Sequence, residues 1–146
     1  KPPPLRRGAT VLLTEDEEPV RAITARILRG AGLTVIEARD GEEALELSRA
    51  HHGAIDLLVS DVVMAKRGGI SLARQLAAER PNLRVLLVSG YTRGALPARE
   101  DPAGNVALLP QPFSPASLLE RVARLLGHPP ASMSSGRPID RSASRA

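Results

Sequence analysis

The sequence predicts a doubly wound α/β domain built on a five-stranded parallel sheet. Five short apolar runs, each of the length of a buried strand, alternate with segments whose apolar residues recur at helical spacing. The fourth run, residues 84–89, is almost continuously apolar, as expected of a strand that is covered on both faces. Strict alternation of this kind is typical of βαβ units, in which helices cover both faces of a parallel sheet.

The first strand is expected at residues 11–14 and the second at residues 33–37, with a helix between them. This helix is predicted to begin near Pro19, a favourable first-turn residue with acidic neighbours, and to end at Gly30 or Gly32. Its apolar side chains recur at Val20, Ile23, Ile27 and Ala31, a spacing typical of one apolar helix face.

A second helix is predicted to begin after Asp40 and to run to about residue 51. Asp40 is followed three residues later by Glu43, which is the spacing of a capping box at a helix N-terminus. The third strand is expected at residues 55–60, and Asp61 closes its carboxyl end.

A loop at residues 64–69 is expected to lead into a third helix, which Pro81 closes. This helix carries Leu72, Ala73 and Leu76 at helical spacing. The fourth strand, residues 84–89, is followed by residues 94–105, a stretch that contains two prolines. We expect a loop there, or at most a turn or two, so that the fourth helix of the domain is weak or absent.

The last strand is expected at residues 106–109. Ser114 is predicted to cap the last helix, with Pro115 in its first position and Gly127 at its end. The apolar face of this helix consists of Leu118, Leu119, Val122, Leu125 and Leu126.

The folded domain is predicted to span residues 9–127. Residues 1–8 form a linker rich in proline and arginine, and residues 128–146 are expected to be a disordered tail because they show no apolar periodicity. The net charge of +4 comes from these two ends, since the domain between them contains slightly more acidic than basic residues. A domain that binds nucleic acid carries positive charge on a folded face, so we expect no nucleic-acid partner.

Composition also limits the compartment and the chemistry. The sequence contains no cysteine, which excludes disulfides and thiolate metal sites and fits a reducing compartment. No apolar run approaches the ~20 residues that span a bilayer, and the N-terminus has neither the apolar core of a signal peptide nor an initiator methionine. We therefore expect a cytoplasmic domain that is not inserted in a membrane and that forms part of a longer protein.

Three carboxylates are expected to meet at one edge of the sheet. Glu15 and Asp16 directly follow the first strand, and Asp61 ends the third. Ligands of a parallel α/β sheet bind outside the carboxyl ends of the strands, so these side chains converge, whereas Asp56 lies at the far end of the third strand. Crowded carboxylates repel one another unless a cation lies among them, and Mg²⁺ is a hard cation that prefers oxygen ligands.

Four segments occur in the order and spacing of a known family. They are TVLLTEDE at residues 10–17, DLLVSDVVM at residues 56–64, VLLVSGY at residues 85–91 and QPF at residues 111–113. Over residues 9–126 the chain resembles the receiver domain of response regulators, and it is most similar to the receiver at the C-terminus of a hybrid sensor histidine kinase. The resemblance implies a flavodoxin-like strand order, 2-1-3-4-5.

The resemblance implies that Asp61 accepts a phosphoryl group from the phosphohistidine of a histidine kinase or a phosphotransfer domain. Glu15, Asp16 and Asp61 would hold Mg²⁺ together with the main-chain carbonyl of Val63. Ser89 would donate a hydrogen bond to the new phosphoryl group, and the domain would then change conformation. The irregular stretch after the fourth strand makes dimerisation through that face unfavourable, so a monomer is expected.

The chain departs from the family at several positions. Gln111 replaces the lysine that pairs with the acidic site, and a neutral donor in place of a charged one costs about 1 kcal/mol. Ala65 replaces a proline, and Leu108 replaces the aromatic residue of a signalling switch. Lys66 or Arg67 either substitutes for the missing lysine or faces solvent. The alternative function is therefore a pseudo-receiver, a protein-interaction module with weak phosphate coupling.

Overall fold

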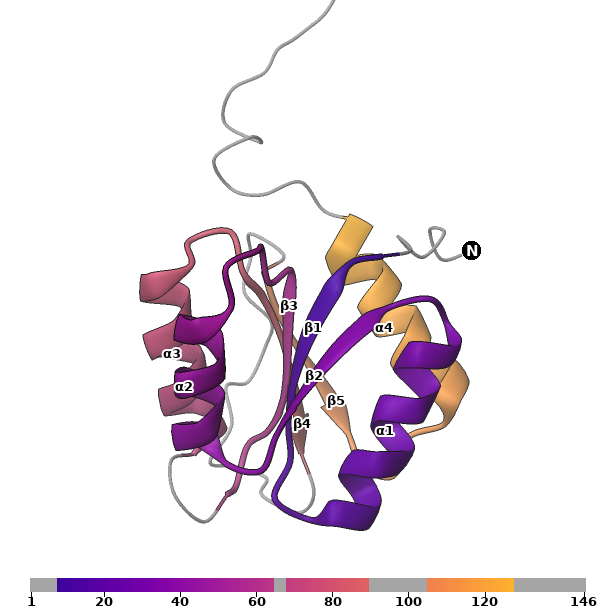
Figure 1. Ribbon diagram of the computed structural model, residues 1–146. Coiled ribbons are helices and arrows are strands. Elements are labelled where there is room, and N and C mark those ends of the chain that lie inside the picture. Colours follow the sequence, from indigo (N-terminus) through magenta and orange to yellow (C-terminus); the bar gives the residue numbers. More distant parts are fainter. Residues whose placement is uncertain (1–7, 65–67, 90–104, 128–146) are drawn as a thin grey trace, which may run out of the picture.

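The computed structural model of the protein describes residues 8–64, 68–89 and 105–127. Parallel strands form one sheet in the order β2-β1-β3-β4-β5. The strands are β1 (Thr10–Thr14), β2 (Thr34–Ala38), β3 (Leu57–Asp61), β4 (Arg84–Ser89) and β5 (Val106–Pro110). This topology confirms the predicted doubly wound parallel sheet and its strand order (Figure 1).

Four helices in the described part of the chain cover the two faces of the sheet. They are α1 (Glu18–Gly30), α2 (Gly41–Ala50), α3 (Gly69–Glu79) and α4 (Pro115–Gly127). Figure 1 shows α1 and α4 on one face and α2 and α3 on the other. None of these helices is long and apolar enough to cross a membrane.

The alternating side chains of the central strands divide the interior into two cores. On one face, Val11 and Leu13 of β1 belong to the same buried cluster as Leu28 of α1. On the other face, Leu12 of β1 belongs to a cluster that contains Leu72 of α3. Because successive strand residues point to opposite faces, a short apolar strand fills both cores and fixes the position of its polar carboxyl end.

Side-chain caps begin two of the helices at the predicted residues. The N–H of Glu43 donates to Oδ1 of Asp40 at 2.9 Å, and the N–H of Ser117 donates to Oγ of Ser114 at 3.0 Å. The reciprocal half of the capping box is shifted by one residue, because Oε1 of Glu43 accepts from the N–H of Arg39 at 2.6 Å. These caps satisfy N–H groups that have no partner within the helix.

The expected apolar face of α1 is wrong at one position. Ile23 is 59% exposed, whereas the buried residues of the helix are Thr24, Ala25 and Leu28. Neighbouring residues of an α-helix point about 100° apart. A face centred on Thr24 and Leu28 therefore turns Ile23 toward solvent.

Several sequence predictions concern segments outside the described residues. These are residues 1–7 of the predicted linker, the loop residues Ala65, Lys66 and Arg67, the stretch 90–104 with its weak or absent helix, and the tail at residues 128–146. The limits of the folded domain, residues 9–127, and the properties of these segments stay predictions.

Candidate functional site

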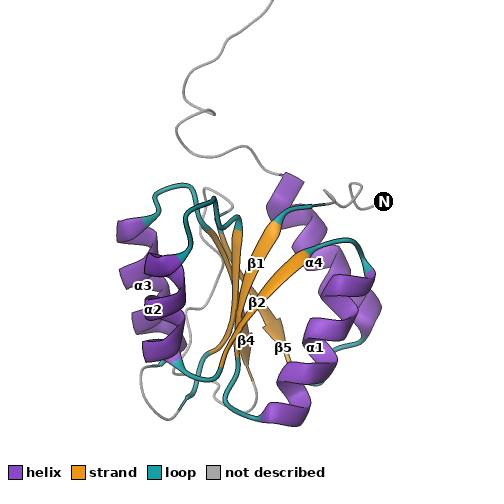
Figure 2. Ribbon diagram, viewed as in Figure 1, coloured by secondary structure: helices purple, strands orange, loops and turns teal. Residues whose placement is uncertain are grey.

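The three carboxylates expected at the strand ends lie together. Glu15 and Asp16 follow β1, Asp61 ends β3, and one carboxylate oxygen from each lies within 4.8 Å of the others. The strands β1 and β3 are parallel neighbours, with Thr14 opposite Ser60. Their following loops therefore leave the sheet at the same edge (Figure 2). The structure thus shows the convergence that the sequence predicts for these side chains.

Glu15 is the buried member of this acidic cluster, with 6% of its surface exposed. Its N–H continues the sheet by donating to the carbonyl of Ala38 at 3.1 Å, and its Oε2 accepts from the N–H of Glu17 at 3.0 Å. Burial raises the pKa of Glu15 from 4.5 to about 7; the Glu17 N–H lowers it, and the nearby Asp61 and Asp16 raise it. In the metal-free protein Glu15 therefore binds a proton until the pH approaches neutrality.

Asp61 is half-buried at the end of β3. Its Oδ1 accepts a hydrogen bond from the N–H of Val63 at 3.3 Å. Burial raises the pKa of Asp61, the N–H groups of Val63 and Val62 lower it, and the charge of Asp16 raises it. The folded protein thus disfavours negative charge on two neighbouring carboxylates, and a cation among them would remove that cost.

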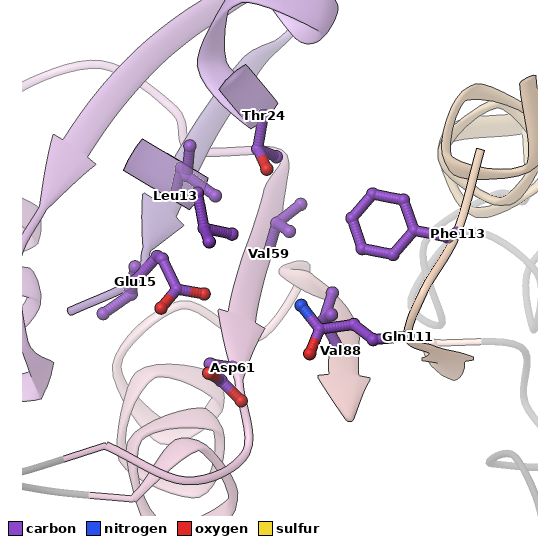
Figure 3. Close-up of a pocket in the computed structure, with 10 residues that line it drawn as sticks. Leu13, Glu15, Thr24, Val59, Asp61, Val88, Gln111 and Phe113 are labelled. Carbon is purple, nitrogen blue, oxygen red and sulfur yellow. The ribbon is translucent and has the colours of Figure 1, made fainter. Parts of the chain in front are cut away.

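A pocket lies between the acidic cluster and the loop that follows β5 (Figure 3). Its volume is about 240 Å³, counting the open space at its mouth. The residues that line it are Leu13, Thr14, Glu15, Val20, Thr24, Val59, Asp61, Val88, Gln111 and Phe113. The side chains of Glu15, Asp61 and Gln111 point into this space. None of these lining residues is basic, so Gln111 brings a neutral donor to a pocket that contains two carboxylates.

Main-chain contacts place Ser89 and Gln111 at the same edge of the sheet. The N–H of Gln111 donates to the carbonyl of Ser89 at 2.7 Å. Ser89 is the buried last residue of β4 and lies opposite Pro110, while the preceding Val88 lies opposite Asp61. The structure therefore brings both residues to the strand end that carries Asp61. Their roles toward a phosphoryl group stay predictions.

Val63 and Asp56 lie beyond opposite ends of β3. Val63 is 60% exposed and follows Asp61 in the loop after the strand, next to the acidic cluster. Asp56 lies at the amino end, where its Oδ2 accepts from the N–H of Thr10 at 2.8 Å and its own N–H donates to the Thr10 carbonyl at 2.9 Å. Asp56 thus joins two strand beginnings, away from the acidic cluster.

Sequence reasoning misses two residues that touch the main chain of the cluster. A Cβ atom on Gly69 would lie 2.2 Å from the carbonyl oxygen of Asp61, so only glycine allows α3 to begin this close to the end of β3. Arg21 donates from Nη1 to the carbonyl of Glu15 at 2.9 Å. In the sequence, Gly68 and Gly69 indicate only a turn, and Arg21 is one of several charged residues on a helix.

The chain is similar in sequence to a protein family and to known proteins. Residues 11–123 match the response regulator receiver domain. The chain is 43% identical over 123 residues to the sensor kinase CckA of Brucella abortus (strain 2308), which covers 84% of the chain and 13% of CckA. It is 29% identical over 116 residues to the response regulator receiver protein CpdR of the same strain, which covers 80% of the chain and 95% of CpdR.

The solved structures extend the similarity to three dimensions. The crystal structure of the receiver domain from the hybrid histidine kinase CckA is similar with a TM-score of 0.68 and 38% sequence identity, over 81% of this chain and 99% of that chain. The chain spans only a small part of full-length CckA, so the likeness concerns its receiver domain alone. The family match over residues 11–123 and the five-stranded fold lead to one conclusion: the chain belongs to the response regulator receiver domain family.

Proposed function

We propose that this receiver domain of two-component signalling accepts a phosphoryl group on Asp61 from a phosphohistidine. The observation that supports the proposal is the position of Asp61, a half-buried carboxylate at the sheet edge, close to Glu15 and Asp16 and lining a pocket. In the transfer, an oxygen of Asp61 forms a bond to phosphorus while the phosphorus–nitrogen bond of the phosphohistidine breaks. The imidazole of the donor takes up a proton and leaves as a neutral group.

The donor set around Asp61 suits Mg²⁺. The cluster offers three carboxylates, and all its ligand atoms are oxygens, which this hard ion prefers. Glu15, Asp16 and Asp61 would hold the ion together with the main-chain carbonyl of Val63. Bound there, Mg²⁺ would neutralise negative charge shared between carboxylate and phosphate oxygens.

Ser89 and Gln111 complete the proposed site. The Ser89 hydroxyl would donate to a phosphoryl oxygen, and the Gln111 amide would supply a second, uncharged donor. Ser89 ends β4, and Gln111 lies in the loop between β5 and α4. A phosphoryl group that attracts both residues would therefore shift this part of the domain. This movement is the switch that we propose for the domain.

The partner that we propose is a histidine kinase or a phosphotransfer domain. The support is the similarity to the receiver domain of CckA, which is a hybrid histidine kinase. A phosphohistidine on such a partner must reach Asp61 at the carboxyl edge of the sheet, where Val63 and Asp16 are exposed. We propose that the domain acts in the cytoplasm as a monomer.

Incubation with acetyl phosphate and Mg²⁺ is expected to add a single phosphoryl group to the domain, because Asp61 is the nucleophile and the cation offsets the repulsion between like charges. Intact-mass spectrometry measures the addition, and hydroxylamine should remove it, as expected of an acyl phosphate. The matched control contains a chelator in place of Mg²⁺. A domain that stays unmodified with both acetyl phosphate and a phosphorylated histidine kinase would contradict the proposed function.

A second candidate function is a pseudo-receiver, which binds proteins but responds weakly to phosphorylation. The observation that favours it is Gln111, a neutral residue in a pocket whose described lining contains no basic side chain. The intact acidic cluster favours the phosphoacceptor instead. The two candidates differ in how strongly phosphorylation alters the conformation of the domain.

Gln111→Lys is expected to strengthen the response to phosphorylation and to stabilise the metal-free domain by about 1 kcal/mol. The reason is that a charge-assisted hydrogen bond contributes roughly 1 kcal/mol more than a neutral one, and the ammonium would enter a pocket with Glu15 and Asp61. Urea unfolding measures the stability, and the NMR shifts caused by Mg²⁺ and beryllofluoride measure the response. Gln111→Met, which has similar length and no charge, is the control. If the lysine and methionine variants respond equally, the missing charge is not what limits the switch.

A further inference from the structure

Arg21 extends from α1 to the end of β1, where the acidic cluster begins. Its side chain is 12% exposed, so the guanidinium lies largely out of water. Nη1 donates to the main-chain carbonyl of Glu15 at 2.9 Å, and Nε donates to Oε1 of Glu37 on β2 at 3.3 Å. One side chain of α1 therefore joins the ends of two neighbouring strands.

The hydrogen bond from Arg21 holds the main-chain carbonyl of Glu15, whose N–H and carboxylate have other partners. The N–H of Glu15 is already held by the carbonyl of Ala38, and its carboxylate accepts from the N–H of Glu17. The carbonyl that Arg21 binds belongs to the peptide group that links Glu15 to Asp16. Fixing this peptide group fixes the direction in which the main chain enters Asp16, and so affects two of the three clustered carboxylates.

Arg21 suits this position because the guanidinium is planar and donates in several fixed directions. Glu37 orients it from one side, while another nitrogen reaches the carbonyl of Glu15. Lysine would offer a single ammonium on a flexible stem and does not reproduce this fork. Glu37 pairs with the positive charge of the Arg21 guanidinium, and the contact of Arg21 with the cluster is the hydrogen bond to the main-chain carbonyl of Glu15.

Arg29 offers an internal comparison. It also pairs with Glu37, with Nη1 and Oε2 2.9 Å apart, and donates from Nη2 to the carbonyl of Val35 at 3.1 Å. Arg29 donates to Glu37 and Val35 of β2, whereas Arg21 also donates to the carbonyl of Glu15. The two arginines thus share a carboxylate partner but differ in their contact with the acidic cluster.

We propose that Arg21 is a positioning residue that orients Glu15 and Asp16 for binding a divalent cation. The inference rests on the proposed function, because it assigns the acidic cluster as the cation site. Residues that orient metal ligands without touching the metal change metal affinity roughly 10–100-fold when they are replaced. A residue that only joins α1 to β2 would change the stability of the domain and leave the affinity for the cation unaltered.

The test compares Arg21→Gln with the matched control Arg29→Gln, and uses Mg²⁺ as the probe. We expect Arg21→Gln to weaken Mg²⁺ binding roughly tenfold and Arg29→Gln to leave it within about twofold of wild type. Arg21→Lys should be intermediate, since it keeps the charge but not the fork. Isothermal titration calorimetry or NMR titration measures the dissociation constant, and urea unfolding shows how much of each variant is folded under the same conditions.

Hydrogen exchange at the N–H of Glu17 supplies a readout that needs no metal, because this group binds the carboxylate of Glu15. Exchange should accelerate in Arg21→Gln more than in Arg29→Gln. If both variants bind Mg²⁺ as wild type does, the positioning role is overturned and Arg21 is only a structural link. If wild type itself does not bind Mg²⁺, the proposed cation site fails, and the positioning role fails with it.

Discussion

Asp61→Asn is expected to abolish phosphorylation and to leave the domain folded. The amide keeps the size of the side chain and an oxygen that can accept from the N–H of Val63, but it lacks the carboxylate nucleophile. The variant should also be more stable than wild type in the absence of metal at about pH 8. Two unit charges 4 Å apart repel by about 1 kcal/mol or more, and the substitution removes one charge from a cluster within 4.8 Å. Intact mass after treatment with acetyl phosphate and urea unfolding measure the two effects.

Asp56→Asn is the matched control, because it changes the same residue type at the opposite end of the same strand region. Asp56 accepts a hydrogen bond from Thr10 and lies away from the pocket. Its substitution should leave phosphorylation at the wild-type level and should not stabilise the domain. Phosphorylation that persists in Asp61→Asn, with the same sensitivity to hydroxylamine, would show that another carboxylate is the acceptor.

The location of the acidic cluster could be predicted from the sequence because it depends on few geometric facts. Parallel strands bring their carboxyl ends to one edge, and in the sequence β1 and β3 are apolar runs followed by acidic residues. Predicting that Glu15 and Asp16 lie near Asp61 requires no knowledge of side-chain packing. The same reasoning places Asp56 at the opposite edge of the sheet, away from the three carboxylates. The structure shows Asp56 there, hydrogen-bonded to Thr10.

The contacts that hold the cluster in place could not be predicted, because they depend on packing between segments. Arg21 reaches the carbonyl of Glu15 only because α1 packs across β1 and β2 with a particular rotation about its axis. Apolar spacing did not define that rotation, as the exposed Ile23 shows. Gly69 is a similar case, since its closeness to the carbonyl of Asp61 depends on how α3 docks after β3.

The metal-free domain is expected to lose stability as the pH rises from about 4.5 to about 7. Burial raises the pKa of Glu15 in the folded state from 4.5 to about 7. The folded protein therefore binds the proton more tightly than the unfolded chain, and the resulting stabilisation is complete below about pH 4.5 and lost as the pH rises through 7. At 1.36 kcal/mol per pH unit, the loss is at most about 3 to 4 kcal/mol. Urea unfolding at a series of pH values, with a chelator present, measures it.

Glu15→Gln is the control that isolates this titration, because glutamine has the shape of a protonated glutamate and no ionisable group. The difference in stability between wild type and the variant should grow in favour of the variant between about pH 4.5 and 7, and titrating groups that do not interact with Glu15 cancel in that difference. Glu79, whose pKa the hydrogen bond from Arg49 lowers to about 2, stabilises the fold above about pH 4.5 and acts in a lower pH window. Equal pH profiles for wild type and Glu15→Gln would refute the role assigned to Glu15.

Mg²⁺ is expected to offset part of this loss, and to do so more strongly at high pH. The cation binds the ionised carboxylates of the folded domain, so its binding competes with protonation of Glu15 and Asp61. A concentration ten times the dissociation constant stabilises the folded state by about 1.4 kcal/mol, and this gain should shrink toward pH 5, where protons occupy the same oxygens. In Glu15→Gln the gain should be smaller at neutral pH and less dependent on pH. A gain that is equal at pH 5 and pH 8 would place the bound Mg²⁺ outside the acidic cluster, because only there do the cation and the protons share their ligand atoms.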